Sequence, residues 1–159
     1  MSLRDARDDD AGGLIALIGG VFAEYPGCVL DVDGEIPELR RIASAFRVWR
    51  GEFWVVEEGR EIVACVGYSR SGDSDAVELR KLYVRGDQRR KGLGRALCDR
   101  VEQAAHALRS SRIELWSDTR FTDAHRLYEK LGYVRGTETR ALHDISNTIE
   151  YYYSRSLDR

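Results

Sequence analysis

The chain has 159 residues, of which 43 % are hydrophobic and 33 % are charged, and its formal net charge is −2 at pH 7. This length and composition predict a single domain over residues 1–159 that buries a core without help from disulfides or a metal. The three cysteines are scattered, with no Cys-x-x-Cys pair and no zinc-ligand spacing. We therefore expect no metal site.

The periodicity of the hydrophobic residues predicts the secondary structure in chain order. The expected elements are a strand at 2–5, a helix at 9–22, a turn-rich segment at 24–35, a helix at 35–49, a strand hairpin at 53–58 and 61–70, a turn at 71–75, a strand at 76–84, a helix at 92–108, a strand at 112–118, a helix at 123–131 and two final strands, the second at 147–154. Thr122 is the expected N-cap of the 123–131 helix, and Gly132 its stop. Strands interrupted by single helices predict an α/β (α+β) fold with a mixed, mostly antiparallel sheet of six to seven strands and helices on both faces.

The strand at 76–84 alternates in polarity, which predicts the side chains that share a face. Strict alternation places Val77, Leu79 and Lys81 on one face, and Glu78, Arg80, Leu82 and Val84 on the other. The carboxylate of Glu78 is therefore expected to point into the same cleft as Leu82 and Val84.

Missing sequence features indicate the cellular location and argue against membrane and nucleic-acid partners. The first ten residues do not have the pattern of a secretion signal, and no apolar run approaches the roughly 18 residues of a membrane span. We expect a cytoplasmic protein with no membrane partner. The basic stretch is short and the whole chain is acidic, so we expect no nucleic-acid partner.

Opposite charges gather in two parts of the chain. Residues 5–38 hold nine acidic side chains and one basic one, whereas residues 80–95 hold seven basic and one acidic. Within the basic stretch, a strand leads into a glycine-containing loop that opens a helix. Helix N-termini present unpaired N–H groups, and glycine lets an anion approach the backbone. The loop is therefore a candidate pyrophosphate site.

The loop has three alternative interpretations. The P-loop pattern is absent, because Gly92 is followed by Leu93 and Gly94. A dinucleotide site would use the same two glycines and Glu114 about 20 residues on, but Leu97 stands where the third glycine belongs. The loop can also be a basic loop before an ordinary helix, with no ligand.

Two motifs in this region resemble those of one family. Arg89-x-x-Gly92-x-Gly94, after a strand ending in LYV, is similar to the R/Q-x-x-G-x-G/A motif of the GNAT superfamily of acyl-CoA N-acyltransferases. About 30 residues on, AHRLYEKLGY (124–133) resembles the family's A-x-x-L-Y-x-x-x-G-F segment. The resemblance implies a GNAT-like fold and acetyl-CoA as co-substrate. It also makes a homodimer an expectation.

The resemblance assigns roles to individual residues. The backbone of Leu82, Tyr83 and Val84 would hold the pantetheine arm. Tyr128 matches the tyrosine that protonates the departing thiolate, and Glu78 falls where histone-type members place a general-base glutamate. The pyrophosphate would be held by the residues of the loop, namely Arg89, Arg90, Lys91, Gly92, Leu93, Gly94 and Arg95. Phe121 departs from the pattern, since the family often has an asparagine there that bonds the CoA arm.

Each catalytic assignment has a structural alternative. Glu78 can simply pair with Arg80, and Tyr128 can be a core residue. His125, three residues from Tyr128, is expected at the surface. The expected activity is acetyl transfer to a primary amine by direct attack, and the alternative is a non-catalytic acyl-CoA-binding sensor module.

The amine acceptor is expected to bind the segment EYPGCVLDVDGE (24–35), since the family places acceptor specificity there. Clustered carboxylates in this segment favour a cationic small molecule or peptide amine. The candidate ligands are Glu24, Asp31, Asp33 and Glu35, with Tyr25 as an aromatic wall. Trp54 is expected in the core instead.

Overall fold

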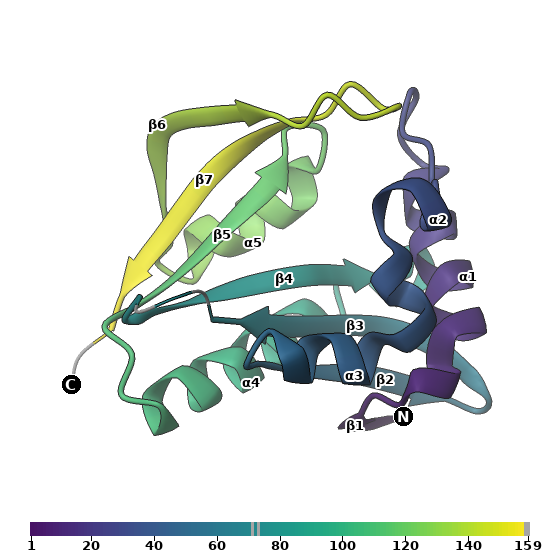
Figure 1. The fold of residues 1–159 in the computed structure, drawn as a ribbon, viewed down its shortest axis with the longest axis horizontal. Helices are drawn as coiled ribbons and strands as arrows, with labels where there is room; N and C mark the ends of the chain where they lie inside the picture. The colour runs from purple at the N-terminus through teal and green to yellow at the C-terminus, as the bar shows by residue number, and fades with distance from the viewer. Residues whose placement is uncertain (71, 73, 158–159) are drawn as a thin grey trace.

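A computed structural model describes residues 1–70, 72 and 74–157, and its central feature is one open, seven-stranded sheet with the strand order β1-β2-β3-β4-β5-β7-β6 (Figure 1). The mixed sheet expected from the sequence is confirmed. Residues 71 and 73 of the predicted 71–75 turn lie outside the described residues. The strands are β1 (Ser2–Asp5), β2 (Glu52–Glu58), β3 (Glu61–Ser69), β4 (Ala76–Val84), β5 (Arg112–Asp118), β6 (Val134–Ala141) and β7 (Ile149–Ser156).

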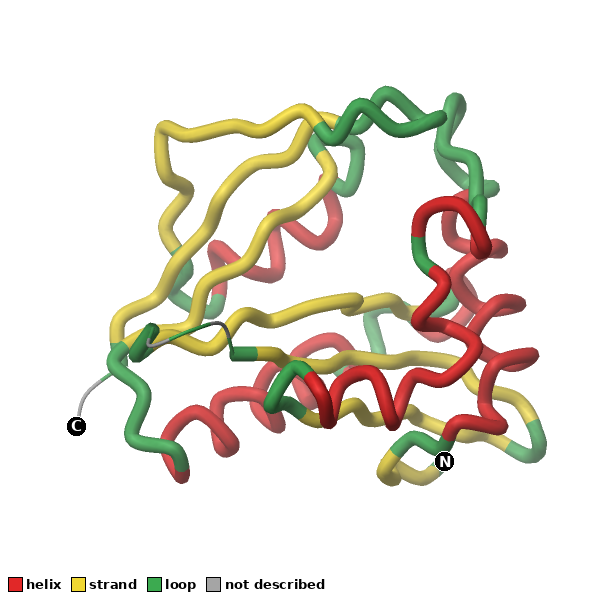
Figure 2. The backbone as a smooth tube through the Cα atoms, in the orientation of Figure 1, coloured by secondary structure: helices red, strands yellow, loops and turns green. Residues whose placement is uncertain are grey.

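The sheet divides into two halves that separate at one point. All neighbouring strands are antiparallel except β4 and β5, which are parallel and pair only from Ala76 with Arg112 to Glu78 with Glu114. Beyond Glu78 the two strands diverge, which the strand tubes of Figure 2 show clearly. Among the residues that the structure describes, the edge of β4 that faces β5 therefore has no strand partner from Leu79 to Val84.

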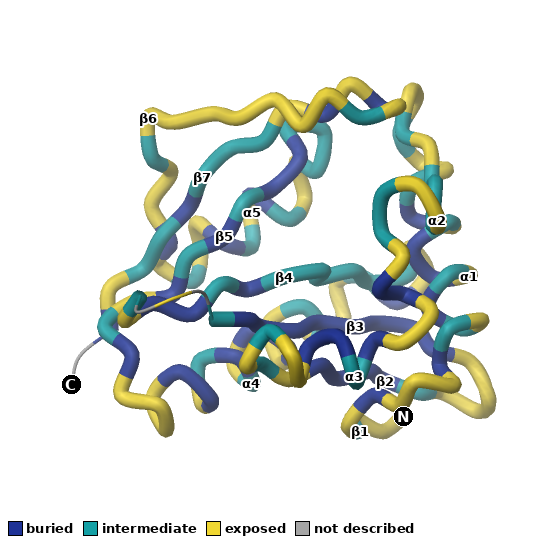
Figure 3. The backbone as a smooth tube through the Cα atoms, viewed as in Figure 1, coloured by how far each residue is buried: buried dark blue, intermediate teal, exposed yellow. Residues whose placement is uncertain are grey.

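Helices cover both faces of the β1–β4 half, and one further helix contacts β6 in the other half. The α-helices are α1 (Ala11–Phe22), α2 (Val32–Glu35), α3 (Ile42–Val48), α4 (Leu93–Ala107) and α5 (Thr122–Lys130), of which α5 is the one beside β6, and the 3₁₀ helices are η1 (Asp8–Asp10), η2 (Pro37–Arg41) and η3 (Gly86–Gln88). α1 and α3 pack on one face, and α4 packs on the other. β3 is buried along nearly its whole length, whereas β6 is an exposed edge (Figure 3).

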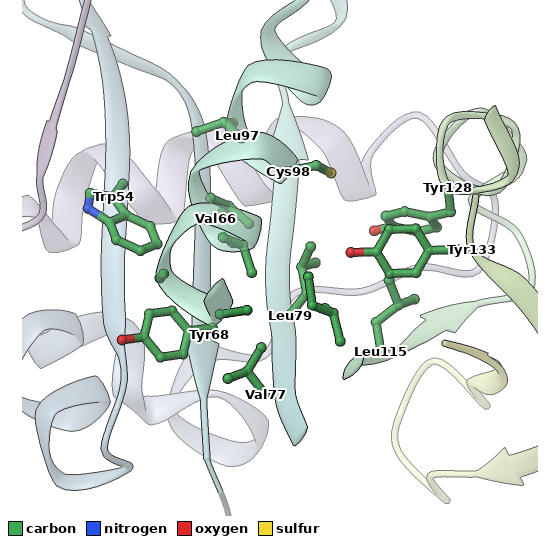
Figure 4. Packing of buried hydrophobic residues seen from close by; sticks show 14 of the residues in the cluster. Trp54, Val66, Tyr68, Val77, Leu79, Leu97, Cys98, Leu115, Tyr128 and Tyr133 are labelled. Carbon is green, nitrogen blue, oxygen red and sulfur yellow. The ribbon is translucent and has the colours of Figure 1, made fainter. Parts of the chain in front are cut away.

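The core on the α4 face joins both halves of the sheet. Figure 4 shows Trp54 and Leu97 at one end of this core, with Tyr128 and Tyr133 at the other. Trp54 is 2 % exposed, so the core role predicted for it is confirmed.

Several predicted helix boundaries differ from the structure. The helix expected at 9–22 begins within η1 and becomes α1 at Ala11, and the turn-rich segment 24–35 contains the short helix α2. The helix expected at 35–49 is a 3₁₀ turn, η2, opened by Pro37 and followed by the shorter α3. Thr122 is the first residue of α5, with Phe121 at the N-cap position, so the predicted Thr122 cap is wrong. The Gly132 stop is confirmed, because its φ of 92° ends the helix in the left-handed region that glycine tolerates.

A β-bulge in β4 changes the faces predicted by simple alternation. The β3–β4 register shifts between Cys65 and Gly67, and Lys81 on β4 has a φ of 56°. After the bulge, Leu82 and Val84 pack on the α4-side core together with the earlier residues Val77 and Leu79. The expectation that Glu78 shares a face with Leu82 and Val84 is therefore wrong, because the bulge inserts one residue between them.

Candidate active site

The first cavity lies where β4 and β5 separate, and it has a volume of about 810 Å³. Its walls come from the end of β4, the loop before α4, the first turn of α4 and one side of α5. Nine of the ten residues predicted for cofactor binding line it: Leu82, Tyr83, Val84, Arg89, Arg90, Gly92, Leu93, Gly94 and Arg95. Lys91 is the exception, since its Nζ instead donates a 3.4 Å hydrogen bond to Gln88.

The loop at one end of this cavity is shaped to accept an anion. Gly92 is the N-cap of α4 with a φ of 84°, and Arg90 also has a positive φ, of 63°. No hydrogen bond found in the described part of the chain uses the backbone N–H groups of residues 90–95. A Cβ on Gly94 would lie 2.8 Å from Leu127, so glycine keeps α4 and α5 close. These donors and cations fit a pyrophosphate.

The motif residue Arg89 makes contacts within the chain. Its two terminal nitrogens donate to Glu24 at 2.6 and 2.8 Å, and its Nε donates to the carbonyl of Val84 at 3.1 Å. Arg89 therefore ties the end of β4 to the end of α1, and its guanidinium fixes the shape of the loop.

A second cavity of about 550 Å³ lies on the other side of the β4 edge. It is bounded by the segment from Cys28 to Glu38 and by the facing strands β4, β5 and β7. The loop between β6 and β7 closes it. Ser146 exchanges hydrogen bonds with the backbone of Val29, at 2.8 and 3.2 Å, and Ile145 donates to Glu35 at 3.1 Å.

The two cavities share four lining residues: Leu82, Tyr83, Phe121 and Ala124. Phe121, in place of the family's asparagine, belongs to an aromatic cluster at this junction. Its ring lies 5.0 Å from that of Tyr25, 6.1 Å from that of Phe22 and 6.2 Å from that of Tyr83. The junction is therefore apolar and offers no side-chain amide.

Tyr128 lines the second cavity beside Ala124, one turn along α5. Its side chain is 4 % exposed, and its ring packs 5.7 Å from both Tyr133 and Tyr153. Burial raises the pKa of Tyr128 well above its usual range. The phenol is therefore protonated at neutral pH and can donate a proton.

Glu78 faces the α3 side of the sheet. Its carboxylate pairs with Arg80 at 3.4 Å, and burial raises its pKa although Arg80 opposes the shift. Arg80 lines the second cavity, whereas Glu78 is not among the lining residues. Glu78 is therefore separated from this cavity by Arg80, with which it pairs.

The candidate acceptor residues are divided between three places. Asp31 and Glu35 line the second cavity, where Asp31 also accepts a hydrogen bond from Gly34 and caps α2. Tyr25 lines the first cavity, and Glu24 pairs with Arg89 beside it. Asp33 pairs with Arg40 at 2.7 Å on the exposed surface. The structure does not bring these four carboxylates together.

A buried ion pair in the second cavity was not foreseen from the sequence. Lys81 Nζ lies 2.9 Å from the Glu38 carboxylate, and each side chain is 11 % exposed. Burial alone would raise the pKa of Glu38, but Lys81 outweighs it and the pKa is lowered. Burial lowers the pKa of Lys81 against the opposing effect of Glu38. The bulge at Lys81 turns this side chain toward η2, which no alternation pattern reveals.

His125 is buried, so its predicted surface position is wrong. Its Nε2 lies 3.1 Å from the Ser117 hydroxyl, and its ring stacks on Tyr153 at 5.6 Å. Burial lowers the pKa of His125. His125 and Tyr128, three residues apart, share the buried face of α5.

Within residues 1–70, 72 and 74–157, no three His, Cys, Asp or Glu side chains are grouped so that they could hold a metal ion. In the same residues, no helix has both the length and the apolar character needed to span a bilayer.

A comparison with protein families gives a clear match. The model of the acetyltransferase (GNAT) family matches residues 7–133, so the chain belongs to this family. The match covers both motifs, the divergence of β4 and β5, and all of α4 and α5.

Solved structures share the fold. An acetyltransferase from Streptococcus agalactiae superposes with a TM-score of 0.83 at 20 % identity, covering 98 % of both chains. A putative acetyltransferase from Salmonella typhimurium, solved with its cofactor acetyl-CoA, has a TM-score of 0.74 at 19 % identity, covering 99 % of this chain and 94 % of the other. At these identities the likeness concerns the fold.

Curated relatives are more similar in sequence and are longer proteins. An amino-acid acetyltransferase from Azotobacter vinelandii is 38 % identical over 106 residues, which is 67 % of this chain and 22 % of the relative. An N-acetylaspartate synthetase from Danio rerio is 36 % identical over 120 residues, or 75 % of this chain and 41 % of the relative. The chain thus spans less than half the length of either relative.

Proposed function

We propose that this protein is an N-acetyltransferase that moves an acetyl group from acetyl-CoA to the primary amine of a small molecule. The observation that carries the proposal is the junction of the two cavities. They meet at the unpaired edge of β4, at Leu82 and Tyr83, with Tyr128 beside the junction. One cavity has the charge and shape for a pyrophosphate and the other has room for an amine.

The first cavity would hold the cofactor by backbone contacts. Residues 82–84 offer an unpaired strand edge to the pantetheine arm, as in the addition of a strand to a sheet. The N–H groups of residues 90–95 would bind the pyrophosphate, with Arg90 and Arg95 adding positive charge. Acetyl-CoA, when bound, supplies a thioester that an amine attacks, so that a C–N bond forms as the C–S bond breaks.

The chain's own residues would handle the protons of this reaction. An alkyl ammonium with a pKa of about 10.4 loses its proton at pH 7 at a cost of about 4.6 kcal/mol. Glu78 is the proposed base, acting through water beside Arg80. Tyr128 is the proposed acid, and its buried phenol would protonate the departing sulfur.

The names of the relatives suggest the kind of acceptor. Both curated relatives are named for acetylating amino acids or aspartate. We propose an amino acid or a similar small amine, and a volume of about 550 Å³ accommodates one. This replaces the cationic acceptor favoured by the acidic segment 24–35, because Glu24 and Asp33 lie outside the second cavity.

Detection of the released CoA thiol tests the proposal. The protein with acetyl-CoA should release CoA when amino acids or other small amines are added, in proportion to an acetylated product seen by mass spectrometry. Binding of acetyl-CoA without release for any amine would favour the sensor module instead. Absence of binding would contradict both.

A further inference from the structure

Two arginines of the second cavity use one nitrogen of the guanidinium group for an ion pair and leave the two terminal nitrogens without a hydrogen bond among the described residues. Arg80 on β4 pairs with Glu78 through its Nε, at 3.4 Å, and Arg140 on β6 pairs with Glu150 through its Nε, at 2.7 Å. Among the described residues, no hydrogen bond uses the terminal nitrogens of either arginine. Both residues line the cavity. The terminal N–H groups of both are therefore available to a ligand.

Aromatic rings hold both guanidinium groups in place. Arg80 lies over the ring of Trp49, with its Cζ 4.6 Å from the centroid, and Arg140 lies over Trp116 at 4.3 Å. Stacking of this kind orients the planar fork and lowers the entropy lost when it binds. Such forks match a carboxylate with two parallel hydrogen bonds.

The acidic residues of the same cavity already have partners in the fold. Glu38 pairs with Lys81, Glu150 with Arg140, and Asp144 accepts two hydrogen bonds from Thr148 at 2.7 and 2.8 Å. Asp31 caps α2, Glu35 accepts from Ile145, and Asp118 accepts from the backbone of Arg120. Each of these carboxylates thus has at least one partner within the fold, whereas the terminal N–H groups of Arg80 and Arg140 have none among the described residues.

The side chains of Arg80 and Arg140 lie on the same face of the sheet. β4 and β5 pair Glu78 with Glu114, and on β5 the side chain of Trp116 lies two residues on, on the same face. Arg140, from β6, reaches across β7 to the ring of Trp116. The two forks therefore approach the cavity from opposite halves of the divided sheet, as two separate anchor points.

We propose that the acceptor is an amine that carries two carboxylates, such as a dicarboxylic α-amino acid, and that Arg80 and Arg140 bind one carboxylate each. The inference rests on the proposed acetyl transfer and specifies its acceptor. It makes both arginines specificity-determining residues of the second cavity.

Kinetics with a graded set of amines test the inference. We would compare L-aspartate and L-glutamate with their side-chain amides, their dimethyl esters, and the carboxylate-free amines phenethylamine and spermidine. Hydrogen bonds to charged groups contribute enough for each lost carboxylate to lower kcat/KM by about 10- to 100-fold. If the esters or the carboxylate-free amines are acetylated as well as the dicarboxylates, the inference is overturned and the proposed acetyl transfer stands.

Variants then connect the preference to the two side chains. Arg80→Gln and Arg140→Gln should each raise KM for the dicarboxylate about 10- to 100-fold, with KM for acetyl-CoA unchanged. Arg112→Gln is the matched control for Arg140→Gln. The side chains of Arg112 and Arg140 are both 45 % exposed and each pairs with one glutamate, but Arg112 lies outside the cavity. Equal effects of Arg112→Gln and Arg140→Gln on this KM would contradict the inference.

If no amine is acetylated, the proposed function is wrong. A binding measurement then tests the two arginines independently of catalysis. Succinate and glutarate would be titrated calorimetrically into the protein, with CoA present. The inference expects binding that weakens at least tenfold in Arg140→Gln and not in Arg112→Gln. Absence of binding to the unaltered protein would overturn it.

Discussion

Arg89 and Glu24 lie 65 positions apart and are joined by two hydrogen bonds, of 2.6 and 2.8 Å. The sequence suggested separate ligands for them, a pyrophosphate for Arg89 and an amine for Glu24. Their pairing shows instead that the acidic end of α1 supports the basic loop before α4. The proposed cofactor loop is thus held from a distant part of the chain.

Glu24→Gln should therefore affect the cofactor and not the acceptor. The pair is partly exposed, with Arg89 at 25 % and Glu24 at 38 %, so solvent limits its contribution to at most about 1 kcal/mol. We expect KM for acetyl-CoA to rise by up to about fivefold, with KM for the amine unchanged, in steady-state assays. Asp33→Asn, which breaks an exposed pair outside both cavities, is the control. A rise in the amine KM alone would mean that Glu24 binds the acceptor, as the sequence suggested.

The buried pair of Lys81 and Glu38 predicts a strong coupling in stability. Removal of one partner leaves an unpaired charge in a site that is 11 % exposed, and such changes cost about 3–5 kcal/mol. Glu38→Leu and Lys81→Met should each lower the free energy of unfolding by about this amount. The double variant should lose much less than the sum, as measured by urea denaturation. Additive losses would mean that the two side chains do not stabilise one another.

Tyr128→Phe tests the general acid. General acids contribute about 10²–10⁴-fold, so kcat should fall within that range while KM for acetyl-CoA stays nearly constant. Tyr133→Phe is a close control, since its ring lies 5.7 Å from Tyr128 and is equally buried, but it does not line the second cavity. Normal turnover by Tyr128→Phe would leave the residue as part of the core.

Glu78→Gln tests the general base through its pH dependence. Burial raises the pKa of Glu78, and a base acts only when deprotonated, so activity should fall as the pH drops through a pKa above the ordinary glutamate value of about 4.3. In Glu78→Gln this acidic limb of the kcat/KM profile should disappear along with most of the activity. Glu114→Gln, in register with Glu78 on β5, should keep the limb. An unchanged profile in Glu78→Gln would remove the residue from the mechanism.

Local patterns predicted much of the fold and most of the residues that line the proposed cofactor cavity. The strand that ends in Val84, the glycines 92 and 94, and the helix after them are contiguous, so a local pattern reveals them, although distant Glu24 supports the loop through Arg89. The mixed character of the sheet follows from the order of strands and helices, whereas its strand order was not predicted. Nine of ten predicted cofactor residues accordingly line one cavity.

The acceptor side depends on contacts that no local pattern contains. The bulge at Lys81 arises from the β3–β4 register, and because of it Glu78 and Leu82 lie on opposite faces of the sheet. Arg140 joins the site because β6 lies beyond β7 at the sheet edge, 60 residues after Arg80 in the chain. The acidic residues at 24–35 gather in sequence, whereas in space they bond to Arg89, Gly34, Arg40 and Ile145.

The central claim is that the cleft between β4 and β5 binds acetyl-CoA, and thermal unfolding with acetyl-CoA, NADH and ATP, each in large excess, tests it most directly. A ligand at 100 times its Kd adds about 2.7 kcal/mol, which for a domain of this size raises Tm by about 5–10 °C. The account predicts this rise with acetyl-CoA and not with NADH or ATP. A rise with NADH alone, or no rise with any of the three, would contradict it.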